Sequence, residues 1–234
     1  MGPLADLCAF ALTFRHNLPD FTCEQKIVSN NGRVTQALVT YVSGKEHYSN
    51  VIINGKPAPG YGAEDESRPG LLTTGEFGGD LVSLFTPPIV AEFKLRKETT
   101  LRSHSARVYE FHLPADKNTF WTIYGNNWNV KPELRGELWI EPKTEKLRRL
   151  RIEPVHLASK YNIATDDTTI DYAEVSLADA GISLLPKSSE TNVCTRDNDV
   201  SHLDKTVICF QNVIKFYNCH KFTAKARILG VCRA

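Results

Sequence analysis

The feature that most constrains this fold is a change of hydrophobic period at Leu18. Before it, apolar residues recur at helical spacing, which predicts an amphipathic helix over Pro3–Asn17. Pro3 suits the first turn of a helix, and the residue before Pro19 avoids the helical region, so the helix ends near Asn17. After Leu18, short alternating runs separated by turn residues predict antiparallel strands.

One hairpin and one further helix stand out among these elements. Asn30-Asn31-Gly32-Arg33 predicts a tight turn between strands at Phe21–Ser29 and Val34–Ser43, because Asn and Gly tolerate positive φ. Gly78–Phe85 predicts a short helix that ends before Pro87-Pro88. Further strands are expected at 46–53, 90–95, 106–113, 119–124, 136–141, 147–153, 168–177, 182–193, 205–216 and 222–229.

These elements predict an α+β fold that is mainly β, in a single domain over residues 1–234. Roughly ten strands lie in the range in which an open sheet curls strongly. We therefore expect a strongly curved antiparallel sheet, a half-barrel, whose concave face is covered by the Pro3–Asn17 helix and by the second, short helix.

Composition excludes several classes of function and indicates a compartment. The chain has 28 basic and 27 acidic residues, a balance that argues against nucleic acid as the main partner. No apolar run reaches the roughly 18 residues that cross a bilayer, so no transmembrane segment is expected. Leu7–Phe14 lacks the flanking features of a signal peptide. Six cysteines, an even number, favour a periplasmic or extracellular protein whose native signal peptide is not included in this sequence.

The cysteines allow three interpretations. Cys194 and Cys209 can face each other across a hairpin, and a disulfide closing a loop of about 15 residues contributes about 3 kcal/mol on the chain-entropy model. Cys219 can pair with Cys232 or Cys23. Reduced, buried thiols are the alternative to disulfides. Zinc needs closely spaced ligand pairs, and Cys194, His202, Cys209, Cys219 and His220 contain none, so no metal is expected.

No catalytic motif is recognisable, and we expect neither an enzyme nor a cofactor. HExxH, GxSxG and Walker glycine patterns are absent from the sequence. Ser103-His104-Ser105 is read as a solvated turn, because neighbours on a strand point to opposite faces. Asp166-Asp167 and Glu64-Asp65-Glu66 lack the spacing and the glycine of a calcium loop and are read as polar loops.

Two groups of side chains are candidates for binding. The basic run of Lys146, Arg148, Arg149 and Arg151 is interleaved with Leu147, Leu150 and Ile152, which predicts one buried face and a bulge near Arg148-Arg149. Binding of anionic lipid headgroups is an alternative for this run. The aromatic residues Phe111, Trp121 and Trp139 are the candidate ligand-binding residues of the concave face, with ordinary core packing as the alternative.

Several segments resemble a known superfamily. The strand Gly136–Pro142 (GELWIEP), its Lys143-Thr144 turn and the strand LRRLRI resemble a hairpin of the LolA-like, lipoprotein-carrier-like proteins. The segments HNLPDFTCEQKI, TTGEFGGDLVSLF and YNCHKFTAKARI resemble a group of uncharacterised exported bacterial proteins. The resemblance implies a half-barrel around helices that binds acyl chains on its concave face. The six cysteines and the acidic loop depart from the carrier pattern.

The sequence therefore leaves two hypotheses about function. The first is a non-catalytic exported module that holds a lipid, a lipoprotein or another apolar ligand in the concave face of the sheet. The second is a structural or protein-interaction domain whose interior is filled by its own helices. The ligand, the disulfide connectivity and the oligomeric state stay open.

Overall fold

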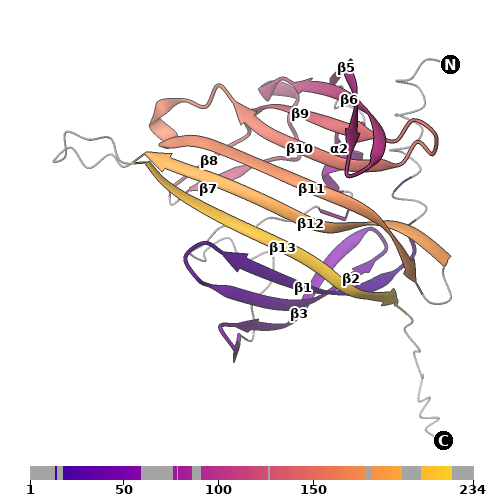
Figure 1. Ribbon diagram of the computed structural model, residues 1–234. Coiled ribbons are helices and arrows are strands. Elements are labelled where there is room, and N and C mark those ends of the chain that lie inside the picture. The colour runs from indigo at the N-terminus through magenta and orange to yellow at the C-terminus, as the bar shows by residue number, and fades with distance from the viewer. Residues whose placement is uncertain are drawn as a thin grey trace, which may run out of the picture.

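The described part of the chain forms an open antiparallel sheet of 11 strands and a separate two-stranded hairpin. Figure 1 shows the computed structural model, which describes residues 14, 18–58, 76–77, 79–85, 91–125, 127–177, 181–196 and 207–222. The strands of the large sheet are β1 (Phe21–Ser29), β2 (Val34–Val42), β3 (Lys45–Ile53), β4 (Lys56–Pro57), β5 (Glu92–Leu101), β6 (His104–Leu113), β9 (Glu133–Ile140), β10 (Leu147–Val155), β11 (Ile163–Leu177), β12 (Gly181–Arg196) and β13 (Val207–Lys221).

The order of strands places the two ends of the chain beside each other. It runs β4-β3-β2-β1-β13-β12-β11-β10-β9-β6-β5, so β4 and β5 form the edges and the sheet is not closed. The first strand, β1, pairs with the last, β13, and every pairing is antiparallel. Figure 1 shows that the sheet is twisted and bent, with β1–β3 turned away from β9–β12. The predicted large antiparallel sheet is confirmed.

Three short helical elements and one small hairpin complete the described structure. α2 (Gly79–Ser83) lies between β4 and β5 in the sequence, within the predicted Gly78–Phe85 helix. η1 (Ala115–Lys117) and η2 (Ser159–Tyr161) are single turns of 3₁₀ helix. β7 (Ile123–Gly125) and β8 (Trp128–Val130) pair only with each other. Among the residues that the structure describes, no helix is long and apolar enough to cross a membrane.

One face of the sheet carries the core, and we call it the inner face. Cross-strand pairing puts Tyr109 opposite Leu138, Leu138 opposite Leu150, and Leu150 opposite Ile170, so these four side chains share that face. All four are buried. The register continues through β12, β13 and β1 to β2, where Phe21 and Tyr41 pair and stack at 5.2 Å between ring centroids. The opposite face is the outer face.

Side chains from the described helical residues belong to one apolar cluster of the core. Leu81 and Leu84 are fully buried in the same apolar cluster as Phe111. Phe14 is helical and buried, and its ring meets Tyr172 edge-on at 6.1 Å. The rest of the predicted Pro3–Asn17 helix lies outside the described residues. So does most of the strand expected at 222–229.

The strand expected at 119–124 is present only at its end, from Ile123, and residues 119–122 are not strand. Asn118 is buried, and its side chain ties the backbone at Trp121 and at Pro132 together. An Asx residue that binds nearby backbone groups competes with regular pairing, so this stretch turns. Extended structure begins only at Ile123, in the small β7–β8 hairpin.

Candidate functional site

The inner face holds two apolar clusters that meet at Leu18. The first lies over β6, β9, β10 and β11 and includes Phe111, Leu138 and Leu150. The second lies over β1, β2, β12 and β13 and includes Phe21 and Ile214. Leu18, the residue at which the sequence pattern changes, packs against both clusters. Together they form a continuous apolar surface on one side of an open sheet.

Aromatic side chains line this surface near the β5 edge. Phe111 is fully buried, and Phe93 lies 6.1 Å from it between ring centroids. Phe85 stacks on Phe93 at 4.7 Å with nearly parallel rings. Phe120 and Trp121 are partly buried against the same cluster. The aromatic surface is therefore covered at its centre and partly exposed at its border, the arrangement that lets an apolar ligand contact it.

Trp121 is held in place by Asn118. The Asn118 amide donates hydrogen bonds to the carbonyl oxygens of Trp121 (3.0 Å) and Pro132 (2.7 Å). The backbone N–H of Trp121 donates to Asn118 Oδ1 at 2.9 Å. One side chain thus fixes both ends of the turn that carries the indole. The sequence analysis missed Asn118, since a single Asn in a loop carries no recognisable pattern.

Trp139 lies on the other face of the sheet. It follows the inward-facing Leu138 on β9 and pairs with Val108 and Arg149, so its indole is on the outer face. The Arg149 guanidinium lies 5.8 Å from the centre of its ring. Of the three aromatic candidates, the structure brings Phe111 and Trp121 to one cluster and separates Trp139 from them. The register of β9 decides which face of the sheet Trp139 occupies, and a short apolar run in the sequence does not reveal that register.

A row of polar side chains crosses the inner face beside the apolar clusters. Thr168, Thr191, Asn212 and Ser29 are directly paired neighbours on β11, β12, β13 and β1, and we call them the polar band. Thr168 Oγ1 and Thr191 Oγ1 are 2.9 Å apart, and Ser29 Oγ donates to Asn212 Oδ1 at 2.6 Å. Three of the four residues are buried, the exception being the half-buried Ser29.

Two further polar residues flank the band on the same face. Ser189 lies between Ile170 and Ile214 in the adjacent row, and its buried hydroxyl has no hydrogen-bond partner. Asp166 lies in the row on the other side, paired with Val193. Burial, with a smaller contribution from Asp167, raises the pKa of Asp166 from 3.8 to about 7. Sequence reasoning read Asp166-Asp167 as a polar loop, whereas Asp166 lies in strand β11 and is buried.

The basic run is neutralised by carboxylates. Leu147, Leu150 and Ile152 are fully buried, and the pairing of β10 with β9 slips between Leu147 and Arg149, so the predicted bulge is present. Arg149 binds Asp171 through two hydrogen bonds of 2.7 and 3.0 Å. The bulged residue, Arg148, joins a larger network. These ion pairs favour a structural role for the run over binding of anionic headgroups.

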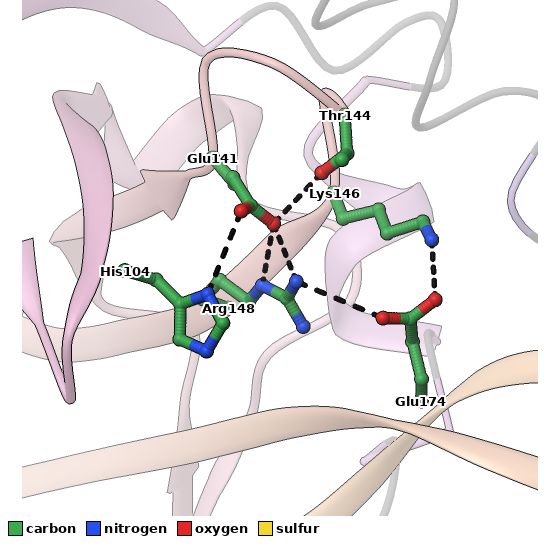
Figure 2. A network of polar contacts seen from close by, with 6 residues as sticks. All are labelled: His104, Glu141, Thr144, Lys146, Arg148 and Glu174. Atoms are coloured by element: carbon green, nitrogen blue, oxygen red, sulfur yellow. Dashed lines mark hydrogen bonds and ion pairs between the residues drawn. The ribbon is translucent and has the colours of Figure 1, made fainter.

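Figure 2 shows that network at the β9–β10 turn. Arg148 binds Glu141 and lies 3.8 Å from Glu174, which also binds Lys146. Thr144 donates to Glu141 at 2.8 Å, and His104 Nδ1 lies 3.5 Å from the same carboxylate. The Arg148 hydrogen bond lowers the pKa of Glu141, and the Lys146 hydrogen bond lowers that of Glu174. The network links the β5–β6 turn, the β9–β10 turn and strand β11.

The outer face also holds a small charged pocket of about 270 Å³. Its walls carry equal numbers of guanidinium and carboxylate groups, from Arg96, Arg135, Arg151, Glu110, Glu137 and Glu153. Arg96 pairs with Glu137, and Arg151 pairs with Glu153. Balanced charge and internal pairing leave little net attraction for an ion.

Both disulfides use residues that were candidates for other chemistry. Cys194 is bonded to Cys209, the pair that the hairpin geometry predicts, and Cys23 is bonded to Cys219. Zinc binds thiolates, so these cysteines are not ligands in this state. Among the described residues, no three His, Cys, Asp or Glu side chains are placed to hold a metal ion. His202, Cys8 and Cys232 lie outside the described residues, as do Glu64-Asp65-Glu66.

Ser103-His104-Ser105 begins strand β6 at its turn from β5. Ser103 has a positive φ of 72°, and His104 is directed to the Glu141 carboxylate in Figure 2.

A separate polar cluster surrounds Tyr48, whose hydroxyl donates to Glu46 at 2.7 Å. Burial raises the pKa of Tyr48 well above its usual range, and Glu46 and Glu76 add to the effect. Tyr48 therefore stays protonated and acts as a hydrogen-bond donor.

No family model and no curated protein sequence matches this chain. Solved structures with a similar course of the chain include a DUF1329 family protein from Desulfovibrio piger, with a TM-score of 0.48, 10% identity and coverage of 97% of this chain and 96% of that one. A LolA superfamily protein from Nitrosomonas europaea gives a TM-score of 0.42, 10% identity and 94% coverage of both chains.

A further similar structure is an outer-membrane lipoprotein-sorting protein domain from Vibrio parahaemolyticus, with a TM-score of 0.44 and 9% identity. It covers 91% of this chain and 90% of that one. At such low identity the likeness concerns the fold alone.

Proposed function

We propose that this protein is a non-catalytic, exported binding module that holds a lipid, a lipoprotein or another apolar ligand on its inner face. The observation that carries the proposal is the continuous apolar surface on one side of an open sheet, with Phe93 and Trp121 partly exposed at its border. The cluster itself is packed, so the partly exposed side chains at its border are where an apolar ligand makes contact. The resemblance of the sequence to LolA-like carriers implies the same class of ligand.

Export is supported by the disulfides. Two disulfides join β1 to β13 and β12 to β13, and such bonds persist in oxidising compartments. A periplasmic or extracellular location follows as part of the proposal. We also propose that the Pro3–Asn17 helix and α2 cover the concave face. Phe14 on Tyr172, and the buried Leu81 and Leu84, support that arrangement.

The proposed mode of action is binding rather than catalysis. The polar groups on the inner face are chiefly hydroxyls and amides, and those of the polar band bond to one another. A hydrolytic mechanism needs a nucleophile, a base and an oriented partner within hydrogen-bond reach. The inner face instead presents apolar area, which selects ligands by shape and hydrophobicity.

The test uses two tryptophans on opposite faces. One protein keeps only Trp121, through Trp128→Phe and Trp139→Phe, and its matched control keeps only Trp139, through Trp121→Phe and Trp128→Phe. Both are titrated with a lysolipid brominated along its acyl chain, since bromine quenches indole fluorescence at contact. We expect quenching of Trp121 and little change for Trp139. Equal quenching of both, or of neither, contradicts binding at the inner face.

The second candidate is an interaction domain with a filled interior. It is favoured by Phe77, Leu81 and Leu84, which are almost fully buried in the two clusters and so occupy part of the inner face. Native mass spectrometry of protein purified from its periplasm or medium separates the two candidates. Retained lipid mass supports the binding module, whereas the bare chain mass, without quenching in the titration above, supports the filled domain.

A further inference from the structure

The polar band divides the inner face into chemically different parts. Thr168, Thr191, Asn212 and Ser29 cross four adjacent strands, and the next row holds Ile170, Ser189, Ile214 and Ile27. Ile170 belongs to the first apolar cluster, and Ile27 and Ile214 belong to the second. Hydrogen-bonding groups and hydrocarbon surface therefore meet along one line, and an amphiphile has the same division within one molecule.

Two groups beside the band have unused hydrogen-bonding capacity. Ser189 is 1% exposed, and its hydroxyl has no hydrogen-bond partner. Asp166 is 8% exposed, and no hydrogen bond or ion pair to its carboxyl occurs among the described residues, but of the two only the Ser189 hydroxyl is both fully enclosed and without a partner. A buried polar group without a partner costs about 1–3 kcal/mol, so such groups call for an explanation. A ligand that supplies the missing bonds is one.

The charge of this region limits what that ligand can be. Three rows of paired residues cross β11, β12, β13 and β1 here: the polar band and the row on each side of it. Among the described residues of these rows, Asp166 is the one ionisable side chain, and none is Lys or Arg. A phosphate or carboxylate head would meet a carboxylate with no counter-charge. A hydroxyl-bearing head without charge can donate to Asp166 and exchange hydrogen bonds with Ser189.

We propose that the polar band, with Asp166 and Ser189, binds the uncharged hydroxyl head of an amphiphile whose hydrocarbon chain lies on the adjoining apolar clusters, an inference that rests on the proposed function. The site selects neutral polar heads of the glycerol class and rejects anionic phosphate heads. Asp166 and Ser189 determine the specificity, and the apolar clusters supply most of the affinity.

The experiment compares two lipids with one acyl chain. 1-Monooleoylglycerol and 1-oleoyl-lysophosphatidic acid are titrated below their aggregation concentrations at pH 8 into the protein that keeps only Trp121, which is the wild-type background for this experiment and gives the fluorescence readout. We expect wild type to bind the neutral lipid at least about tenfold more tightly, as expected when a buried charge has no counter-charge. Asp166→Asn should reduce this ratio to about threefold or less, because the like charge is removed.

One further inner-face variant and two outer-face control variants separate the effect of the site from general effects of mutation. Ser189→Ala should weaken binding of the neutral lipid about fivefold, the loss of one hydrogen bond. Asp167→Asn and Ser188→Ala change the neighbouring residues, whose side chains lie on the outer face, and both should leave the two affinities unchanged. Thermal unfolding of each variant confirms that it is folded.

The outcomes distinguish the inference from the proposed function. If both lipids bind equally to wild type, or if Asp166→Asn and Asp167→Asn have the same effect, the headgroup inference is overturned while lipid binding stands. If neither lipid binds, both proposals fail. Tighter binding of the phosphate lipid also overturns the inference, since the band then attracts the group it should reject.

Discussion

The ring of Phe111 lies against Gly136, the residue directly paired with it on the neighbouring strand. A methyl group on Gly136 would come within 2.5 Å of two ring carbons and would also collide with the carbonyl oxygen of Arg151. The aromatic ring thus fills the space that a side chain at residue 136 would need. This close approach places a fully buried phenyl ring at the centre of the first apolar cluster.

Gly136→Ala is expected to destabilise the protein by about 2–3 kcal/mol, because the clash involves backbone and a packed ring that cannot both move aside. Urea unfolding monitored by circular dichroism measures the change. Gly79→Ala is the control, since nothing lies within 4 Å of a methyl group there. It should change stability by less than about 1 kcal/mol. Equal effects of the two variants would show that packing at Gly136 does not matter.

The sequence predicted the sheet well because the sheet depends on local patterns. The Asn30–Arg33 turn, the alternation in β1 and β2, and the bulge at Arg148 each follow from neighbouring residues. The Cys194–Cys209 pair followed from a hairpin only 15 residues long. Such features need no knowledge of how distant strands are arranged.

The candidate site was harder to predict because it depends on pairing between distant strands. β1 joins β13 across most of the chain, and only this pairing aligns Ser29 with Asn212 to extend the polar band. The face that Trp139 occupies depends on the register of β9, which a one-residue shift would reverse. Asn118 acts through backbone bonds in a loop, which no periodicity reports.

The two disulfides should differ in their contribution to stability. Cys23–Cys219 spans 196 residues and Cys194–Cys209 spans 15. On the chain-entropy model the first restricts the unfolded chain by about 5 kcal/mol and the second by about 3 kcal/mol. Paired Cys→Ala variants of each bond, unfolded in urea without reductant, measure the difference. A larger loss on removing Cys194–Cys209 would contradict the loop-length argument.

Arg148→Met should destabilise the protein at neutral pH by about 1–2 kcal/mol, between the values for exposed and buried ion pairs. The pKa of Glu141 is held below 4.5 chiefly by Arg148. Its contribution to stability is therefore present above pH 4.5 and is lost as pH falls through the lowered pKa. The difference from wild type should shrink below about pH 4. Lys143→Met, an exposed neighbour in the same turn, serves as control.

Asn118→Ala should disturb Trp121 more than the sheet. The variant removes three hydrogen bonds that fix the turn, one of them fully buried. We expect a loss of about 2 kcal/mol and a red shift of Trp121 emission as the indole becomes hydrated. The single-tryptophan protein that retains Trp121 gives the readout. If its emission is unchanged while stability falls, Asn118 supports the loop without positioning the indole.

Asp166→Asn should make stability less dependent on pH. The folded-state pKa of Asp166 is about 7, against 3.8 for an unperturbed carboxyl, so between these values the folded chain retains a proton that the unfolded chain loses. Stability of wild type therefore falls relative to the variant as pH rises from about 4 to 7, by at most about 4 kcal/mol. Above pH 7 the difference stays constant, and below pH 4 it is smallest. Urea midpoints measured from pH 4 to 8 test this, with Ser188→Ala as the uncharged outer-face control. A difference from wild type that does not change with pH would show that the Asp166 carboxyl titrates normally, and hence that the inner face beside the polar band is open to water.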